Sequence, residues 1–316
     1  MRKLITLTLM ALLCAAVASA QIAKNGDHLK PTGKGWAVSD EKAPKEARPG
    51  GGKPSNNGIS YHGGPIMPGT VNVYYIWYGN WTNGAHPTSD SQASVGLLSN
   101  FIGGLSGSGY EKINSTYNDS GNHTVTGNMV LAGTTTDNYS GGTALSDSGI
   151  QTVVSSAISS GRLPKDTNGV YFVLTSSDVN ETSGFCTRYC GWHTRGTIGG
   201  ADIKYSFVGN PDRCPSACEA ETNSANNNSG ADGMASIIAH ESEEAISDPD
   251  LNAWYDSRGA ENADKCAWKF GPTQTTSTGG HYNQTLGGDK FLIQMNWENA
   301  RGGGCSQTLG GPFYVQ

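Results

Sequence analysis

Residues 234–244 read Met-Ala-Ser-Ile-Ile-Ala-His-Glu-Ser-Glu-Glu, an apolar run followed at once by one imidazole and three carboxylates. The apolar spacing predicts a helix that packs on the core of the protein. A residue before proline is disfavoured in the α conformation, so Pro249 predicts that this helix ends near Ser247. Positions four apart share one face of a helix. His240 and Glu244 are therefore expected to coordinate one metal ion.

The pattern resembles the HExxH helix of the zincin peptidases, with glutamate in place of the second histidine. This resemblance implies that His240 and Glu244 are metal ligands and that Glu241, one step round the helix, is a catalytic residue that holds a water molecule. The alternative is a solvated acidic helix end with a structural histidine. Carboxylates near a helix C-terminus oppose the macrodipole, and the apolar run directs this helix inwards, so we favour the metal site.

The start of the chain predicts export. Residues 1–20 combine a basic start, an apolar stretch and the small residues Ala18-Ser19-Ala20, which together indicate a signal peptide. The chain has a net charge of −6, and loss of Arg2 and Lys3 with the signal leaves −8. An acidic protein of this kind is not expected to bind nucleic acid or an anionic membrane. We therefore expect a secreted, extracellular protein.

The remaining chain divides into a leader and one domain. Residues 21–58 are polar, rich in Lys, Gly and Pro, and without periodicity, which predicts a disordered leader or pro-segment. Residues 59–316 are expected to form the folded domain. Strands are predicted at 71–78, 128–132, 169–174, 202–208 and 290–296, and helices at 91–105 and 146–160. The fold class is α+β (mixed α/β), with a central sheet, the zincin-like active-site helix packed on it, and many loops.

Six cysteines remain after the signal, which in an exported chain predicts disulfide bonds. They are Cys186, Cys190, Cys214, Cys218, Cys266 and Cys305. Six cysteines allow fifteen pairings, so the sequence leaves the pairing open. The two CxxxC pairs also admit a four-thiolate zinc site, although export favours oxidation.

Several segments, in order, resemble the EXORDIUM-like, phosphate-induced-protein family of plants and microbes. The matching stretches include Ile76-Trp77-Tyr78-Gly79, Cys190-Gly191-Trp192-His193, Asn252-Ala253-Trp254-Tyr255, Glu261-Asn262-Ala263-Asp264-Lys265-Cys266 and Lys290-Phe291-Leu292-Ile293-Gln294. The resemblance runs from Tyr61 to about Cys305. It implies a secreted protein, associated in plants with the cell wall and with growth responses. The family name implies no settled biochemical activity.

The resemblance to the EXORDIUM-like family helps to identify the third metal ligand. A metzincin-like spacing would place it at Asp250, where the family pattern has an apolar residue. A gluzincin-like spacing suits Glu261 or Asp264, both in a block that belongs to the family pattern. We therefore expect Asp264 or Glu261 to bind the ion, with the other beside it. A disulfide from Cys266 to Cys305 would then anchor this loop.

His193 lies in a predicted turn, Cys190-Gly191-Trp192-His193. It could be a ligand or a partner for a developing oxyanion. The interpretation we favour is a structural histidine or one that supports the metal ligands. In zincins a strand before the active-site helix can bind an extended substrate along its edge, and residues 203–208 are positioned for that role.

Two functions follow from these patterns. The first is a secreted metal-dependent hydrolase, a zinc metallopeptidase that acts on a peptide. The second is a non-catalytic extracellular or cell-wall protein that binds a glycan or matrix polymer and holds a structural ion, for which calcium is the candidate. Glu241 distinguishes them, because hydrolysis needs an acid beside the ligand histidine and a calcium site does not.

Overall fold

The structure is a computed structural model that describes residues 24–25, 28–29, 31–34 and 58–314. The predicted signal peptide, residues 1–20, lies outside the described residues, as does most of the leader. Among the helices of the described part of the chain, none is long and apolar enough to cross a membrane.

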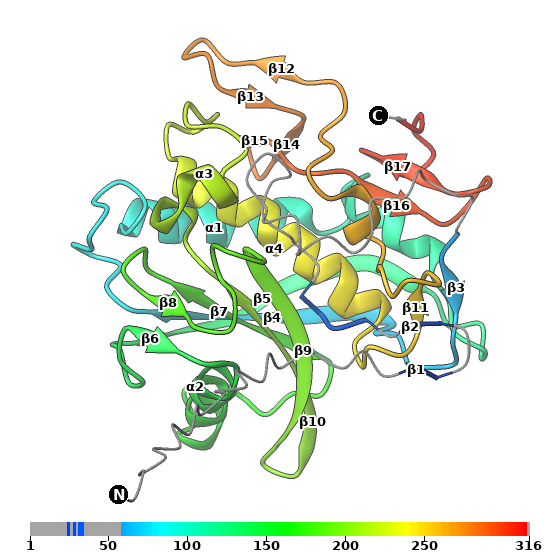
Figure 1. The fold of residues 1–316 in the computed structure, drawn as a ribbon, viewed down its shortest axis with the longest axis horizontal. Coiled ribbons are helices and arrows are strands. Elements are labelled where there is room, and N and C mark those ends of the chain that lie inside the picture. Colours follow the sequence, from blue (N-terminus) through cyan, green and yellow to red (C-terminus); the bar gives the residue numbers. More distant parts are fainter. Residues whose placement is uncertain (1–23, 26–27, 30, 35–57, 315–316) are drawn as a thin grey trace, which may run out of the picture.

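The centre of the molecule is a five-stranded sheet with the order β5-β4-β7-β10-β9 (Figure 1). Its strands are β4 (Gly69–Tyr78), β5 (Val125–Asp137), β7 (Gly169–Thr175), β9 (Gly191–Ile198) and β10 (Ala201–Val208). The first four strands in spatial order run parallel, and β9 pairs antiparallel with β10 at the edge. All seven residues of β7 are buried, as expected for the apolar run of an inner parallel strand.

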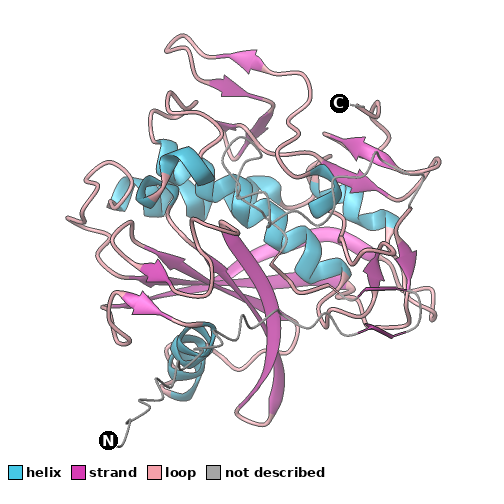
Figure 2. Ribbon diagram, viewed as in Figure 1, coloured by secondary structure: helices cyan, strands magenta, loops and turns pink. Residues whose placement is uncertain are grey.

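Helices cover both faces of this sheet (Figure 2). One face carries α2 (Asp147–Ser159), which contacts β7 and β10. The opposite face carries α1 (Gln92–Leu105) and the long helix α4 (Ser229–Ser247), which contact each other. The side chains of Ser91, Ser146 and Asn228 accept backbone N–H groups at the starts of these helices, so polar caps fix where each helix begins.

Short elements complete the fold. The remaining helical segments are η1 (Glu111–Thr116), η2 (Pro211–Arg213), α3 (Pro215–Cys218) and η3 (Asp264–Cys266). The remaining strands form two-stranded pairs: β1 (Lys24–Asn25) with β2 (His28–Leu29), β3 (Ser60–Tyr61) with β11 (Trp254–Tyr255), β6 (Ala144–Leu145) with β8 (Asn180–Glu181), β12 (Gln274–Thr275) with β13 (His281–Tyr282), β14 (Gln284–Leu286) with β15 (Asp289–Phe291), and β16 (Asn296–Glu298) with β17 (Gly304–Ser306).

The structure confirms the mixed α/β class and corrects several local predictions. The strand expected at 128–132 is much longer, because Val125–Asp137 alternates between buried or half-buried and more exposed positions along the sheet edge. The strand expected at 290–296 is two short strands, β15 and β16, separated by residues 292–295. The predicted turn at 190–193 is wrong, since Gly191–Ile198 is strand β9. Residues 203–208 are also not at the edge, because β10 is paired on both sides.

All six cysteines of the domain form disulfides, as predicted. Cys266 is bonded to Cys305, which confirms the predicted pair. The other pairs are Cys186–Cys214 and Cys190–Cys218. Because these sulfurs are consumed in disulfides, the alternative four-thiolate zinc site is not formed.

Removing the Cys266–Cys305 bridge by a double substitution to serine is expected to destabilise the protein. The bridge spans 39 residues in sequence, and closing a loop of that size is worth about 3–4 kcal/mol in the chain-entropy model. Denaturant unfolding of oxidised wild type and variant measures the difference. Equal unfolding midpoints would show that the bridge adds no stability.

Candidate metal centre

Helix α4 carries the predicted site in its last two turns. The helix ends at Ser247 as expected, and the N–H of Asp248 donates to the carbonyl of Glu244 over 2.7 Å. Nε2 of His240 lies 3.0 Å from Oε1 of Glu244, so the i, i+4 pair meets as the helical spacing predicts. His240, Glu241 and Glu244 are each 0% exposed, which excludes the solvated acidic helix end.

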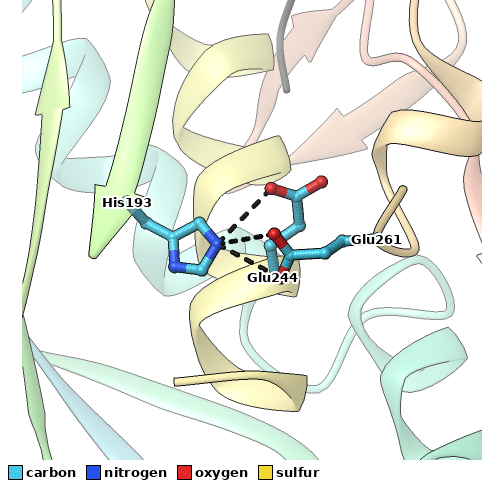
Figure 3. Close-up of side chains that lie close together, drawn as sticks. All are labelled: His193, Glu244 and Glu261. Atoms are coloured by element: carbon cyan, nitrogen blue, oxygen red, sulfur yellow. Dashed lines mark hydrogen bonds and ion pairs between the residues drawn. The ribbon is translucent and has the colours of Figure 1, made fainter. Parts of the chain in front are cut away.

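Strand β9 brings a second imidazole to this helix. Nε2 of His193 lies 3.6 Å from Oε2 of Glu244 and 3.3 Å from each carboxylate oxygen of Glu261 (Figure 3). Gly191 lets the strand approach closely, because a Cβ there would stand 2.5 Å from Cγ2 of Ile237 and 3.1 Å from Oε1 of Glu241. His193 is therefore a direct neighbour of two predicted ligands, a role that the predicted turn did not indicate.

The loop after α4 supplies the remaining acids. Oδ1 of Asp264 lies 3.6 Å from Nε2 of His240. The N–H of Asp264 donates to Oε1 of Glu244 over 3.0 Å, and the N–H of Glu261 donates to Oδ2 of Asp264 over 3.2 Å. The sequence offered Glu261 and Asp264 as alternatives. The structure places both in the cluster, Asp264 beside His240 and Glu261 beside His193.

Asp250, the third alternative, lies elsewhere. Its Oδ1 is 3.6 Å from Nε of Arg195 and 3.7 Å from Nζ of Lys204. Two cations therefore neutralise this carboxylate. The described contacts do not place it beside His240.

The cluster contains two overlapping groups with the spacing of metal ligands. His240, Glu241 and Glu244 each offer an atom within 4.8 Å of the others, and so do His193, Glu244 and Glu261. Glu244 belongs to both groups, and its two oxygens face different imidazoles. The arrangement is therefore two ligand sets that share one carboxylate.

Many polar atoms in the cluster lack a hydrogen-bond partner among the described residues. They are both carboxylate oxygens of Glu241, Oε2 of Glu244, Oε1 of Glu261 and Oδ1 of Asp264. A buried polar atom without a partner costs about 1–3 kcal/mol, and more if it is charged. Five such oxygens in one place fit the ligand shell of a cation.

The pKa shifts of the cluster also fit a cation site. Burial, together with neighbouring carboxylates, raises the pKa of Glu241, Glu244 and Glu261. Burial alone would lower the pKa of His240, but Glu244 and Asp264 raise it well above its usual value. Burial lowers the pKa of His193 to about 4. A group of acids that resists ionisation without a counter-charge is stabilised by bound cations.

Gln294 orients one of the imidazoles. Its side-chain amide lies 2.6 Å from Nδ1 of His240, so Nε2 faces the carboxylates. Partners of this kind fix the tautomer and direction of ligand histidines. No role was predicted for Gln294. The signal available in the sequence was an amide directly after the apolar run Phe291-Leu292-Ile293.

The cluster lies below the surface, and its side chains are 0–1% exposed apart from Asp264 at 14%. A cavity of about 610 Å³ lies elsewhere, where β7 and β10 end, and is lined in part by Ser177, Asn180 and Asp212. Of the cluster side chains, that of Asp264 is the most exposed to solvent.

Glu243, the remaining acid of the run, faces away from the cluster. Its Oε2 accepts a hydrogen bond from the amide of Asn296, and it lies beside the buried Glu111 of η1. Burial raises the pKa of Glu111 to about 8, and burial with Glu111 raises that of Glu243. Burial of the pair therefore favours the protonated form of these two carboxyl groups.

Glu111→Gln is expected to stabilise the protein at alkaline pH. The folded-state pKa of about 8 is above the ordinary value of 4.5, so the folded state loses stability as the pH rises from about 4.5 through 8. A neutral amide removes that loss, worth roughly 2–4 kcal/mol at pH 9. Urea unfolding of wild type and variant at pH 5, 7 and 9 tests this. A stability difference from wild type that does not change with pH would contradict it.

Comparison with known proteins places the chain in a family. Residues 59–307 match the model described as "Phosphate-induced protein 1 conserved region". The chain is 31% identical to Protein EXORDIUM-like 5 of Arabidopsis thaliana over 76% of this chain and 75% of that protein. It is 30% identical to Protein EXORDIUM-like 3 of the same plant over 76% of this chain and 80% of that protein.

No solved structure gives a significant match. The three disulfides and the EXORDIUM-like relatives are consistent with an extracellular location. The family match covers well over half of the chain and confirms the resemblance to the EXORDIUM-like, phosphate-induced-protein family. The chain belongs to the phosphate-induced protein 1 family.

Proposed function

We propose that this protein is a secreted metal-dependent hydrolase that cleaves peptides, and that its metal centre is the cluster around Glu244. One observation carries the proposal: four carboxylates and two imidazoles meet in the protein interior. Among the described residues, Glu244, Glu261 and Asp264 lie within ion-pair distance of the two imidazoles. Buried acids of this number require compensation by bound cations.

The ligand sets favour two divalent ions. With Glu241 kept free as the base, His240 and Glu244 would hold one ion together with Asp264, whose Oδ1 lies 3.6 Å from Nε2 of His240. His193 and Glu261 would hold the other, with Glu244 shared between the two ions. Two divalent cations carry four positive charges, which balance Glu241, Glu244, Glu261 and Asp264. Zinc suits the imidazole–carboxylate mixture, and the high share of carboxylates also admits manganese or iron.

Such ions would activate water as a nucleophile and polarise the carbonyl that it attacks. Glu241 adds the proton transfer. Its buried carboxylate lies beside the ligand group, and it would take a proton from the attacking water and pass it to the leaving amine. His193 and His240 would stay neutral as ligands, with His240 held in direction by Gln294.

Hydrolysis of a peptide library, with and without a chelator, tests the reaction. Activity that chelation abolishes and added zinc or manganese restores would support the proposal. Metal binding without hydrolysis would instead favour the second candidate, an extracellular polymer-binding protein with a structural centre. The burial of His193, His240, Glu244 and Glu261 is the observation that supports this second candidate.

A further inference from the structure

A short piece of the leader lies against the edge strand that carries His193. The carbonyl oxygen of Gly33 accepts a hydrogen bond from the N–H of His193 over 2.9 Å. His193 pairs with Ser206 of β10 on its other side, and β9 is the edge strand, so this N–H points out of the sheet. The leader therefore occupies the N–H group of His193, which would otherwise be available to pair with an extended polypeptide.

Gly33 fits this place because it has no side chain. Its φ of +67° favours glycine, and a Cβ there would stand 1.9 Å from the carbonyl oxygen of His193. Gly33 is buried, whereas the preceding Thr32 is exposed. The close approach selects glycine at the position nearest the cluster.

Lys34 anchors the segment through its side chain. Its Nζ lies 2.7 Å from Oδ2 of Asp147 and 2.7 Å from Oγ of Ser183. The same ammonium stands 5.1 Å from the ring centroid of Tyr189 and 5.5 Å from that of Trp192. A carboxylate, a hydroxyl and two aromatic rings around one cation form a subsite for a basic side chain.

The subsite is assembled from distant parts of the chain. Asp147 begins α2, and Ser183 and Tyr189 lie between β8 and β9. Trp192 is on β9, one residue before His193. The Ser183 hydroxyl also donates to Oδ1 of Asp147 over 2.6 Å, and the Tyr189 hydroxyl donates to the carboxylate of Glu181. These contacts fix the subsite beside the edge strand that carries His193.

We propose that the outer edge of β9 is a binding groove for an extended polypeptide in which glycine precedes lysine or arginine, and that Gly33 and Lys34 occupy it as an internal competitor. That the groove binds a substrate rests on the proposed peptidase function. Binding itself does not depend on hydrolysis. The exposed ion pair alone is weak, but the covalent link gives the internal segment a high effective concentration.

Peptide binding to full-length protein tests the groove directly. The probe is a fluorescent peptide of residues 29–36, and the variant Lys34→Glu releases the internal competitor because it places a carboxylate against Asp147. We expect Lys34→Glu protein to bind the probe at least tenfold more tightly than wild type in fluorescence anisotropy. Lys165→Glu, a charge reversal at a lysine that contacts the carbonyl of Gly199, should bind like wild type.

A second substitution identifies the subsite. Asp147→Asn in the Lys34→Glu background should weaken probe binding at least tenfold, and a probe with glutamate in place of its Lys34 should fail to bind. Equal probe affinity for wild type and Lys34→Glu, or no effect of Asp147→Asn, would overturn the proposal. Because anisotropy needs no turnover, probe binding tests the groove alone, and the peptide-library assay with and without a chelator tests the peptidase separately.

Discussion

Glu244→Ala is expected to strip the purified protein of all tightly bound metal, whereas His240→Ala and His193→Ala should each lose one of two equivalents. The reason is the shared position of Glu244, whose two oxygens face the two imidazoles at 3.0 and 3.6 Å. Each histidine serves a single ligand set. Elemental analysis of protein after dialysis against a weak chelator measures the equivalents.

The neighbouring acid provides a matched control. Glu243→Gln alters the same turn of α4 and an equally buried carboxylate, but this side chain contacts Asn296 and Glu111. It should keep both equivalents. Circular dichroism confirms that each variant is folded. Full metal content in Glu244→Ala would exclude the proposed centre. One equivalent in the wild type would reduce the centre to a single ion, and loss of both equivalents in His193→Ala would contradict separate ligand sets.

Glu241→Gln is expected to lower turnover by ~10²-fold or more, the usual scale for a general base, while metal content stays at the wild-type level. The amide keeps the size of the side chain and cannot accept the proton. Glu241 is fully buried beside the ligands, and neither of its oxygens has a hydrogen-bond partner among the described residues. Its carboxylate is therefore available for proton transfer.

The measurement is kcat on a peptide cleaved by the wild type, with metal content determined on the same samples. Glu243→Gln again serves as the control and should retain activity. Wild-type turnover in metal-loaded Glu241→Gln would exclude this residue as the base, even if both ions are present. A fall in metal content in parallel with turnover would instead assign Glu241 to the ligand shell.

The sequence could predict the part of the site that lies on one helix. The i, i+4 spacing of His240 and Glu244 and the stop before Pro249 follow from local geometry alone. Glu261 and Asp264 were within reach as alternatives, because they follow a family pattern. Their separate positions could be known only from the structure, since Glu261 lies beside His193 and Asp264 beside His240.

His193 was named from the sequence as a possible ligand or supporting histidine, but its position in the fold could not be predicted. Residues 190–193 were predicted to form a turn, but Gly191 begins strand β9. The position of this strand beside α4 depends on long-range strand pairing. One local signal was available. Gly199-Gly200, both with positive φ, separates two eight-residue strands, and a two-glycine turn of this kind favours a hairpin. That hairpin would have placed His193 on an extended strand.

The proposed ligands come from a strand, a helix and a loop, and His193 and Glu261 are 68 residues apart in sequence. The proposed centre is therefore complete only when the sheet and α4 have packed together, and a nascent chain has no preformed site. Proteins generally obtain selectivity among divalent ions from geometry and supply rather than from raw affinity. On this proposal, the ion in the purified protein depends on which ions are present while the chain folds, so the metal supply during recombinant production has to be controlled.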